Sequence, residues 1–97
     1  MMKQLDYCYQ KDPDMVSREI AGEVILVPIR RNVGDLESVY TLNETAALAW
    51  TLFDGIHTVN QIQDQIITEY EVDEDEAERD LIELIQQLEE IGAIARV

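Results

Sequence analysis

Residues that bind metals or catalyse reactions are scarce in this chain. Its 97 residues include one cysteine, Cys8, and one histidine, His57. A single cysteine can form neither an internal disulfide nor a cysteine metal cluster, and a free thiol fits a reducing compartment. The chain also lacks the G-x-S-x-G, H-E-x-x-H, P-loop and G-x-G-x-x-G motifs. We therefore predict no catalytic residue, no metal and no cofactor, and we expect that the chain is not an enzyme.

Long apolar runs are missing as well. No segment approaches the roughly 20 consecutive apolar residues of a membrane-spanning helix. The first residues, MMKQLDYCYQKD, have neither the apolar stretch nor the cleavage site of a secretory signal. These features predict a cytoplasmic protein without a membrane partner. The length suits one domain, which we place at residues 13–97, after a loose polar arm at residues 1–12.

Basic residues are few, with 7 Lys and Arg against 21 Asp and Glu and a net charge of −14. Such a charge keeps the protein soluble and repels phosphate backbones. The third helical segment carries Arg79 among many acidic side chains, whereas a helix that reads DNA is basic. We therefore predict no nucleic-acid partner. We expect a monomer or a weak homodimer whose partners are cationic or bind through backbone and apolar contacts.

Strand signals dominate the first part of the domain. Ala21-Gly22 separates two strand-like runs, at residues 16–20 and 23–29, and thereby predicts a β-hairpin. Residues 38–42, SVYTL, are short and rich in β-branched and aromatic residues, which predicts a third strand. This strand is the last of the three in the chain and could be an edge strand with unpaired backbone groups.

From residue 43 the pattern becomes helical. The first helix begins either at the cap Asn43 or at a capping box formed by Thr41 and Glu44. Residues 93–97 are expected to form a short tail strand. Three strands followed by three helices predict an α+β domain. Capping and stop signals bound the three helices at Asn43 and Asp54-Gly55, at Thr58 and Tyr70, and at Asp73 and Gly92.

The third helix has an unusually wide apolar face. On a helical wheel it covers about 180°, compared with roughly 100° for a helix that rests on one core. Either the domain uses the whole face internally, or one edge of it flanks a groove beside the third strand. An extended peptide could bind in such a groove as an added strand. We expect Ile82 and Ile85 to line it; the opposite edge, with Asp80, Gln87 and Ile91, is the alternative.

The middle of this face is expected to hold the fold. Leu84 and Leu88 lie there, so truncating either should destabilise the protein. Apolar residues of the first two helices recur at helical spacing and are also expected in the core. They are Leu48, Trp50, Phe53, Val59 and Ile66.

The segment YTLNETA at residues 40–46 is followed by Trp50, Asp54-Gly55 and Thr58-Val59. This combination resembles the PqqD family, which includes the D protein of pyrroloquinoline quinone biosynthesis and related recognition elements of modified-peptide pathways. Weaker similarity in the same order extends the resemblance over residues 13–94. The loop at residues 30–37 is longer and more charged than the family's usual connection before the third strand.

The resemblance implies a winged-helix-like domain, with a three-stranded antiparallel sheet followed by three helices, that binds the leader of a ribosomally made precursor peptide. It implies two partners, the precursor and a modifying enzyme, often a radical S-adenosylmethionine enzyme. The alternative is an acidic scaffold that joins two proteins without a precursor. If the chain binds a precursor, the leader would dock as an added strand between the third strand and the third helix. The implied contact residues are Ser38, Val39, Tyr40, Thr41 and Leu42 on the strand, and Asp80, Leu81, Ile82, Leu84 and Ile85 on the helix.

Overall fold

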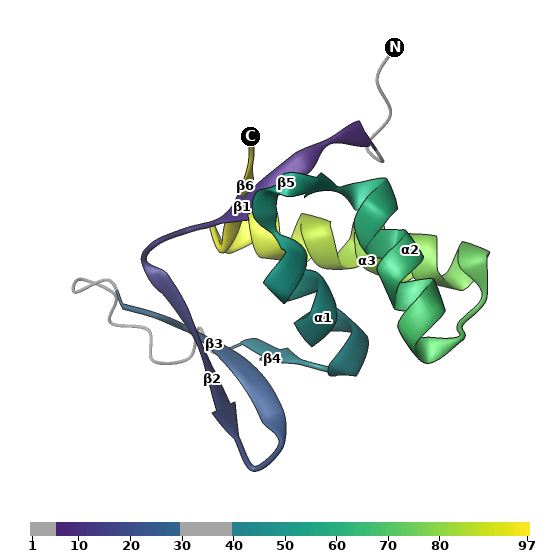
Figure 1. Ribbon diagram of the computed structural model, residues 1–97. Coiled ribbons are helices and arrows are strands. Elements are labelled where there is room, and N and C mark those ends of the chain that lie inside the picture. Colours follow the sequence, from purple (N-terminus) through teal and green to yellow (C-terminus); the bar gives the residue numbers. More distant parts are fainter. Residues whose placement is uncertain (1–5, 30–39) are drawn as a thin grey trace.

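The computed structural model describes residues 6–29 and 40–97 of the chain (Figure 1). Within these residues the chain forms three helices and two three-stranded antiparallel sheets, which confirms the predicted α+β class. Ser38 and Val39 of the predicted third strand, and the loop at residues 30–37, lie outside the described residues.

The first sheet contains the predicted hairpin. Its strands are β2 (Met15–Ile20), β3 (Glu23–Pro28) and β4 (Tyr40–Leu42), in the order β2-β3-β4. Ala21 and Gly22 have φ angles of 54° and 83°. Two successive positive φ angles are those of a type I′ turn, whose twist matches that of the flanking strands. The turn closes the pair Ile20↔Glu23 and thereby sets the register of the hairpin.

The second sheet was not predicted as a sheet. It consists of β1 (Cys8–Lys11), β5 (Asp54–Thr58) and β6 (Ile94–Arg96), in the order β5-β1-β6. The tail strand was predicted, and β6 confirms it. The sequence indicated a loose arm over residues 1–12 and a turn around His57, whereas the structure places β1 and β5 there. These short strands have no regular alternation, and they form because segments far apart in the chain meet.

Tyr9 explains why β1 is fixed to the domain. Its side chain is 2% exposed and packs edge-on against Phe53, with ring centroids 6.3 Å apart. Burying an aromatic side chain of this size stabilises the fold by roughly 1.5–3 kcal/mol. The strand is also paired on both sides, to β5 and to β6. Residues 8–11 are therefore part of the domain rather than of an arm.

The three helices begin at caps that the sequence contains. Helix α1 (Glu44–Leu52) is capped by Asn43, whose side chain accepts a hydrogen bond from the Ala46 amide at 2.8 Å. Helix α2 (Val59–Tyr70) begins with the predicted capping box of Thr58 and Gln61. Helix α3 (Glu74–Glu90) is capped by Asp73. Each cap satisfies amide donors that lack a partner inside the helix.

The core lies between the helices and the inner faces of both sheets. Trp50, Phe53, Val59 and Ile66 are buried as predicted, and Leu48 is partly buried against them. Leu26 of β3 is completely buried and joins the first sheet to this core. Helix α3 crosses behind α1 and α2 (Figure 1), and its apolar residues are buried in the core.

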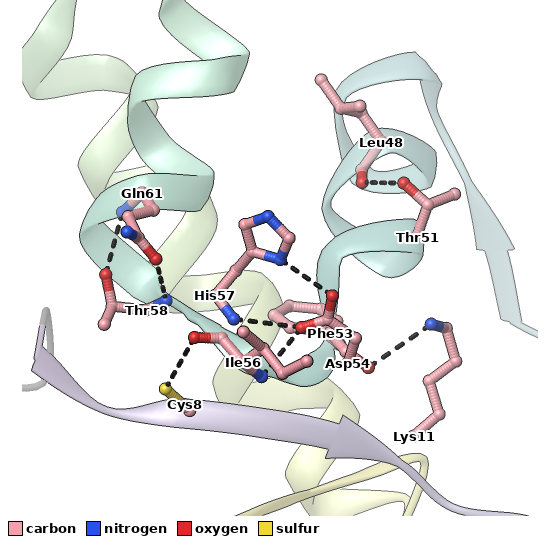
Figure 2. A network of polar contacts seen from close by, with 10 residues as sticks. All are labelled: Cys8, Lys11, Leu48, Thr51, Phe53, Asp54, Ile56, His57, Thr58 and Gln61. Carbon is pink, nitrogen blue, oxygen red and sulfur yellow. Dashed lines mark hydrogen bonds and ion pairs between the residues drawn. The ribbon is translucent and has the colours of Figure 1, made fainter.

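Asp54 organises the turn between α1 and β5 (Figure 2). Its Oδ1 atom accepts hydrogen bonds from the backbone amides of Ile56 at 2.9 Å and His57 at 3.0 Å, and its Oδ2 atom lies 2.8 Å from Nδ1 of His57. The amide of His57 contributes most to lowering the pKa of Asp54 from 3.8 to about 2, followed by the amide of Ile56. These contacts favour the ionised carboxylate.

We expect the Asp54 carboxyl to titrate with a midpoint near pH 2 in the folded protein. An aspartate in an unfolded chain titrates near 3.9. The folded pKa is the lower of the two, so the stabilisation is complete above about pH 4 and is lost as the pH falls through 2. Carboxyl ¹³C shifts recorded by NMR would measure the midpoint. The variant Asp54→Asn should unfold with a weaker pH dependence in this window; an unchanged dependence would contradict the assignment.

Candidate functional site

A cavity of about 400 Å³ opens between β4 and α3. Its wall on one side is the β4 segment, with Tyr40 and Thr41, and on the other side the face of α3 between Glu76 and Gln87. The N-terminal part of α1 and one residue of α2 close the space between them. The apolar side chains that line the cavity are Ala46, Ile66, Val72, Ala77, Leu81 and Leu84.

Strand β4 forms an edge of the first sheet among the described strands, and Thr41 is the residue whose backbone faces outward. The amide of Ile29 donates to the carbonyl of Asp14 at 2.8 Å, which makes this pair a hydrogen-bonded one. Hydrogen-bonded and non-bonded pairs alternate along antiparallel strands. Leu26 and Val24 lie an odd number of residues before Ile29 and therefore belong to the non-bonded pairs with β2. Their backbone groups accordingly point toward β4.

The register then determines which part of β4 is available. Val24 pairs with Leu42 and Leu26 pairs with Tyr40, whereas Ile25 and Thr41 form the non-bonded pair between them. The N–H and C=O groups of Thr41 therefore point away from β3, toward the side on which Thr41 lines the cavity. An outward-facing donor and acceptor on one edge residue are the elements that an added strand uses.

A side-chain hydrogen bond joins the two walls of the cavity. The Tyr40 hydroxyl of β4 donates to Oε1 of Gln87 on α3. Both residues line the cavity. The bond connects positions 47 residues apart in the chain, so it holds β4 beside α3 where no backbone pairing does so.

The cavity follows one edge of the apolar face of α3. Of the helix residues that the resemblance implied as leader contacts, Asp80, Leu81 and Leu84 line the cavity. Ile82 and Ile85 do not line it, and Ile85 is completely buried in the core. The groove was expected along Ile82 and Ile85; of the alternative edge, Asp80 and Gln87 line the cavity and Ile91 does not. The reason is the rotation of α3, which turns Ile85 onto the core and the opposite edge toward β4.

Helices α1 and α2 contribute lining residues that sequence reasoning did not identify. Asn43, Thr45 and Ala46 come from the start of α1, and Ile66 comes from α2. Ile66 was expected only in the core, and its side chain is 4% exposed, so it belongs to the core and the cavity floor together. No local pattern marks these residues, because their place in the cavity depends on how the helices pack.

No group of three His, Cys, Asp or Glu side chains in residues 6–29 and 40–97 is arranged to hold a metal ion. None of the described helices combines the length and the apolar composition needed to cross a membrane.

The fold and the cavity define a small α+β domain with an open sheet edge beside a helix-lined cavity. The family model described as coenzyme PQQ synthesis protein D (PqqD) matches residues 23–94. The chain therefore belongs to the PqqD family, as the motif at residues 40–46 indicated. No curated protein matches the chain.

Two solved structures are similar to the chain over most of their length. One is TbiB1 in complex with the TbiA(beta) leader peptide, with a TM-score of 0.70 and 25% identity over 88% of this chain and 93% of that one. The other is lasso peptide synthetase B1 complexed with the leader peptide, with a TM-score of 0.71 and 30% identity over 90% of this chain and 96% of that one.

Proposed function

We propose that this chain binds the leader segment of a ribosomally made precursor peptide. The leader forms an added strand along β4 and occupies the cavity between β4 and α3. The observation that carries the proposal is the outward-facing backbone of Thr41 beside that cavity. Membership of the PqqD family and the leader-peptide complexes of the two similar proteins support it.

Backbone and side chains of the groove have different roles in the proposed binding. Main-chain hydrogen bonds to Thr41 provide affinity that does not depend on the leader's sequence. Alternate side chains of an extended peptide point to the same side, and those that face α3 enter the cavity above Leu81 and Leu84. The fit of these side chains in the cavity provides the specificity. The residues proposed to contact the leader are Tyr40, Thr41, Asp80, Leu81 and Leu84, with Gln87 added from the cavity lining.

Presentation to a modifying enzyme is the second part of the proposal. The chain holds the leader, and the segment to be modified extends from the groove to an enzyme that acts on it, for which a radical S-adenosylmethionine enzyme is one candidate. In this role the chain itself contributes no catalytic residue. Its effect on the reaction is to raise the local concentration of the precursor at the enzyme.

The test is a titration of the ¹⁵N-labelled chain with the leader of a short precursor peptide encoded beside its gene. Binding at the proposed site should shift the amide resonance of Thr41 and the resonances of α3 from Asp80 to Gln87 most strongly. Residues of the β5-β1-β6 sheet serve as the internal control and should change little. Shifts confined to that sheet, or none at a peptide excess, would contradict the proposal.

A further inference from the structure

Three carboxylates form a stripe along the wall of the cavity that α3 provides. Glu76, Asp80 and Glu83 all line the cavity and are exposed. Their spacing of four and then three residues places them on one face of the helix, and Gln87 continues the same row. We call these three acidic residues the acidic stripe. Within the described residues no Lys or Arg side chain lines the cavity.

Of the four Lys and Arg residues in the described part of the chain, Arg18 lies on β2 and Arg79 on α3, and neither lines the cavity. Nζ of Lys11 lies 3.4 Å from the carbonyl oxygen of Phe53 and 5.5 Å from the centre of the Trp50 ring. The guanidinium of Arg96 lies 4.4 Å from the centre of the Tyr7 ring. Both belong to the second sheet rather than to the cavity. Arg79 lies within one turn of Glu76 and Glu83 on α3, whereas the acidic stripe itself lines the space that the leader would occupy.

The dimensions of the stripe match those of an extended peptide. The helix rises about 10 Å over the seven steps from Glu76 to Glu83. Side chains on the same face of a strand repeat about every 6.7 Å. The stripe thus spans two successive side chains that point toward α3, and the apolar floor beside it, with Leu81 and Leu84, suits an apolar neighbour.

Resting on the proposed function, we propose that this groove selects leader segments in which a Lys or Arg lies beside an apolar anchor on the face turned toward α3. The basic side chain reaches the acidic stripe, and its aliphatic part covers the apolar floor, as long basic side chains do at such boundaries. An acidic residue at the same place would face three like charges and would be rejected.

The experiment selects binders from a displayed library of short random peptides with the whole chain. Lys and Arg should be enriched over Asp and Glu by about tenfold, the effect of a few partly exposed ion pairs. The stripe variant, Glu76→Gln with Asp80→Asn and Glu83→Gln, should lose this enrichment. A control variant on the same helix, Asp75→Asn with Glu89→Gln and Glu90→Gln, removes the same net charge away from the cavity and should keep it.

The outcomes separate this inference from the proposed function. The selection is repeated with Thr41→Pro, which removes the outward amide. If the selected peptides need Thr41 but show no preference for basic residues, or keep that preference in the stripe variant, the inference is overturned and the proposed function stands. If the control variant loses the enrichment as well, net charge explains it and the inference is again overturned. If no peptide is selected, or binding is indifferent to Thr41→Pro, both proposals are overturned.

Discussion

Thr41→Pro is expected to weaken leader binding at least about tenfold while the protein stays folded. Proline lacks the amide hydrogen that an added strand would accept from Thr41. The pair Ile25↔Thr41 is a non-bonded one, so the substitution removes no hydrogen bond of the β3-β4 pairing. The loss in the free energy of unfolding should therefore be about 1 kcal/mol. Peptide titration by calorimetry and a urea melt measure the two quantities.

The first sheet offers a matched control on its other edge. Ser17 pairs with Leu26, and Leu26 directs its backbone toward β4, so the amide of Ser17 also points away from β3. Ser17→Pro makes the same chemical change at an outward position far from the cavity and should leave the affinity unchanged. Thr41→Val keeps the amide and should bind normally. If Thr41→Pro binds the leader as tightly as Ser17→Pro does, strand addition at β4 is refuted.

Ile85→Ala is expected to lower the free energy of unfolding by about 2–5 kcal/mol, as large-to-small changes in a core do. Ile85 is completely buried and its neighbour Leu84, which lines the cavity, is 8% exposed. Leu84→Ala enlarges a cavity that already exists, so its cost in stability should be smaller. Its cost in leader affinity should be about tenfold, because the peptide's apolar anchor loses a contact.

Ile82→Ala completes the series on α3. Ile82 is partly exposed and does not line the cavity, so both its stability and its leader affinity should stay close to those of the unmodified chain. Urea melts measure the stability of the Ile85→Ala, Leu84→Ala and Ile82→Ala variants, and peptide titrations measure their leader affinity. A variant Ile85→Ala or Ile82→Ala that is stable but binds poorly would place the groove on the other edge of the helix.

The parts of the fold that the sequence predicted are those with a local cause. Asn43, Thr58 and Asp73 cap the helices because each side chain reaches amides two or three residues further along the chain. The hairpin also has a local cause, because Ala21 and Gly22 adopt the positive φ angles of a two-residue turn. By contrast, β1 and β5 pair across about 50 residues, from Cys8 to Thr58. Neither segment has a pattern that reveals its partner, so both were interpreted as irregular.

The candidate site likewise combines features that the sequence predicted with one that depends on packing. Tyr40 and Thr41 were predicted through the family motif and line the cavity, and the edge position of β4 was predicted from its place after the hairpin. The helical wheel correctly gave the angles between the residues of α3, but a wheel contains no information on which edge faces a strand elsewhere in the fold. That rotation depends on packing against α1 and α2. For this reason Ile85 was expected in the groove, although it lies in the core.

The hydrogen bond between Tyr40 and Gln87 bears on the entropy of binding. Because it links β4 to α3 in the free protein, it restricts the relative motion of the two walls of the groove before any peptide arrives. The conformational freedom lost on association is then mainly that of the leader, and the protein is preorganised for it. The association rate should in that case be limited by encounter and orientation rather than by an opening step of the protein.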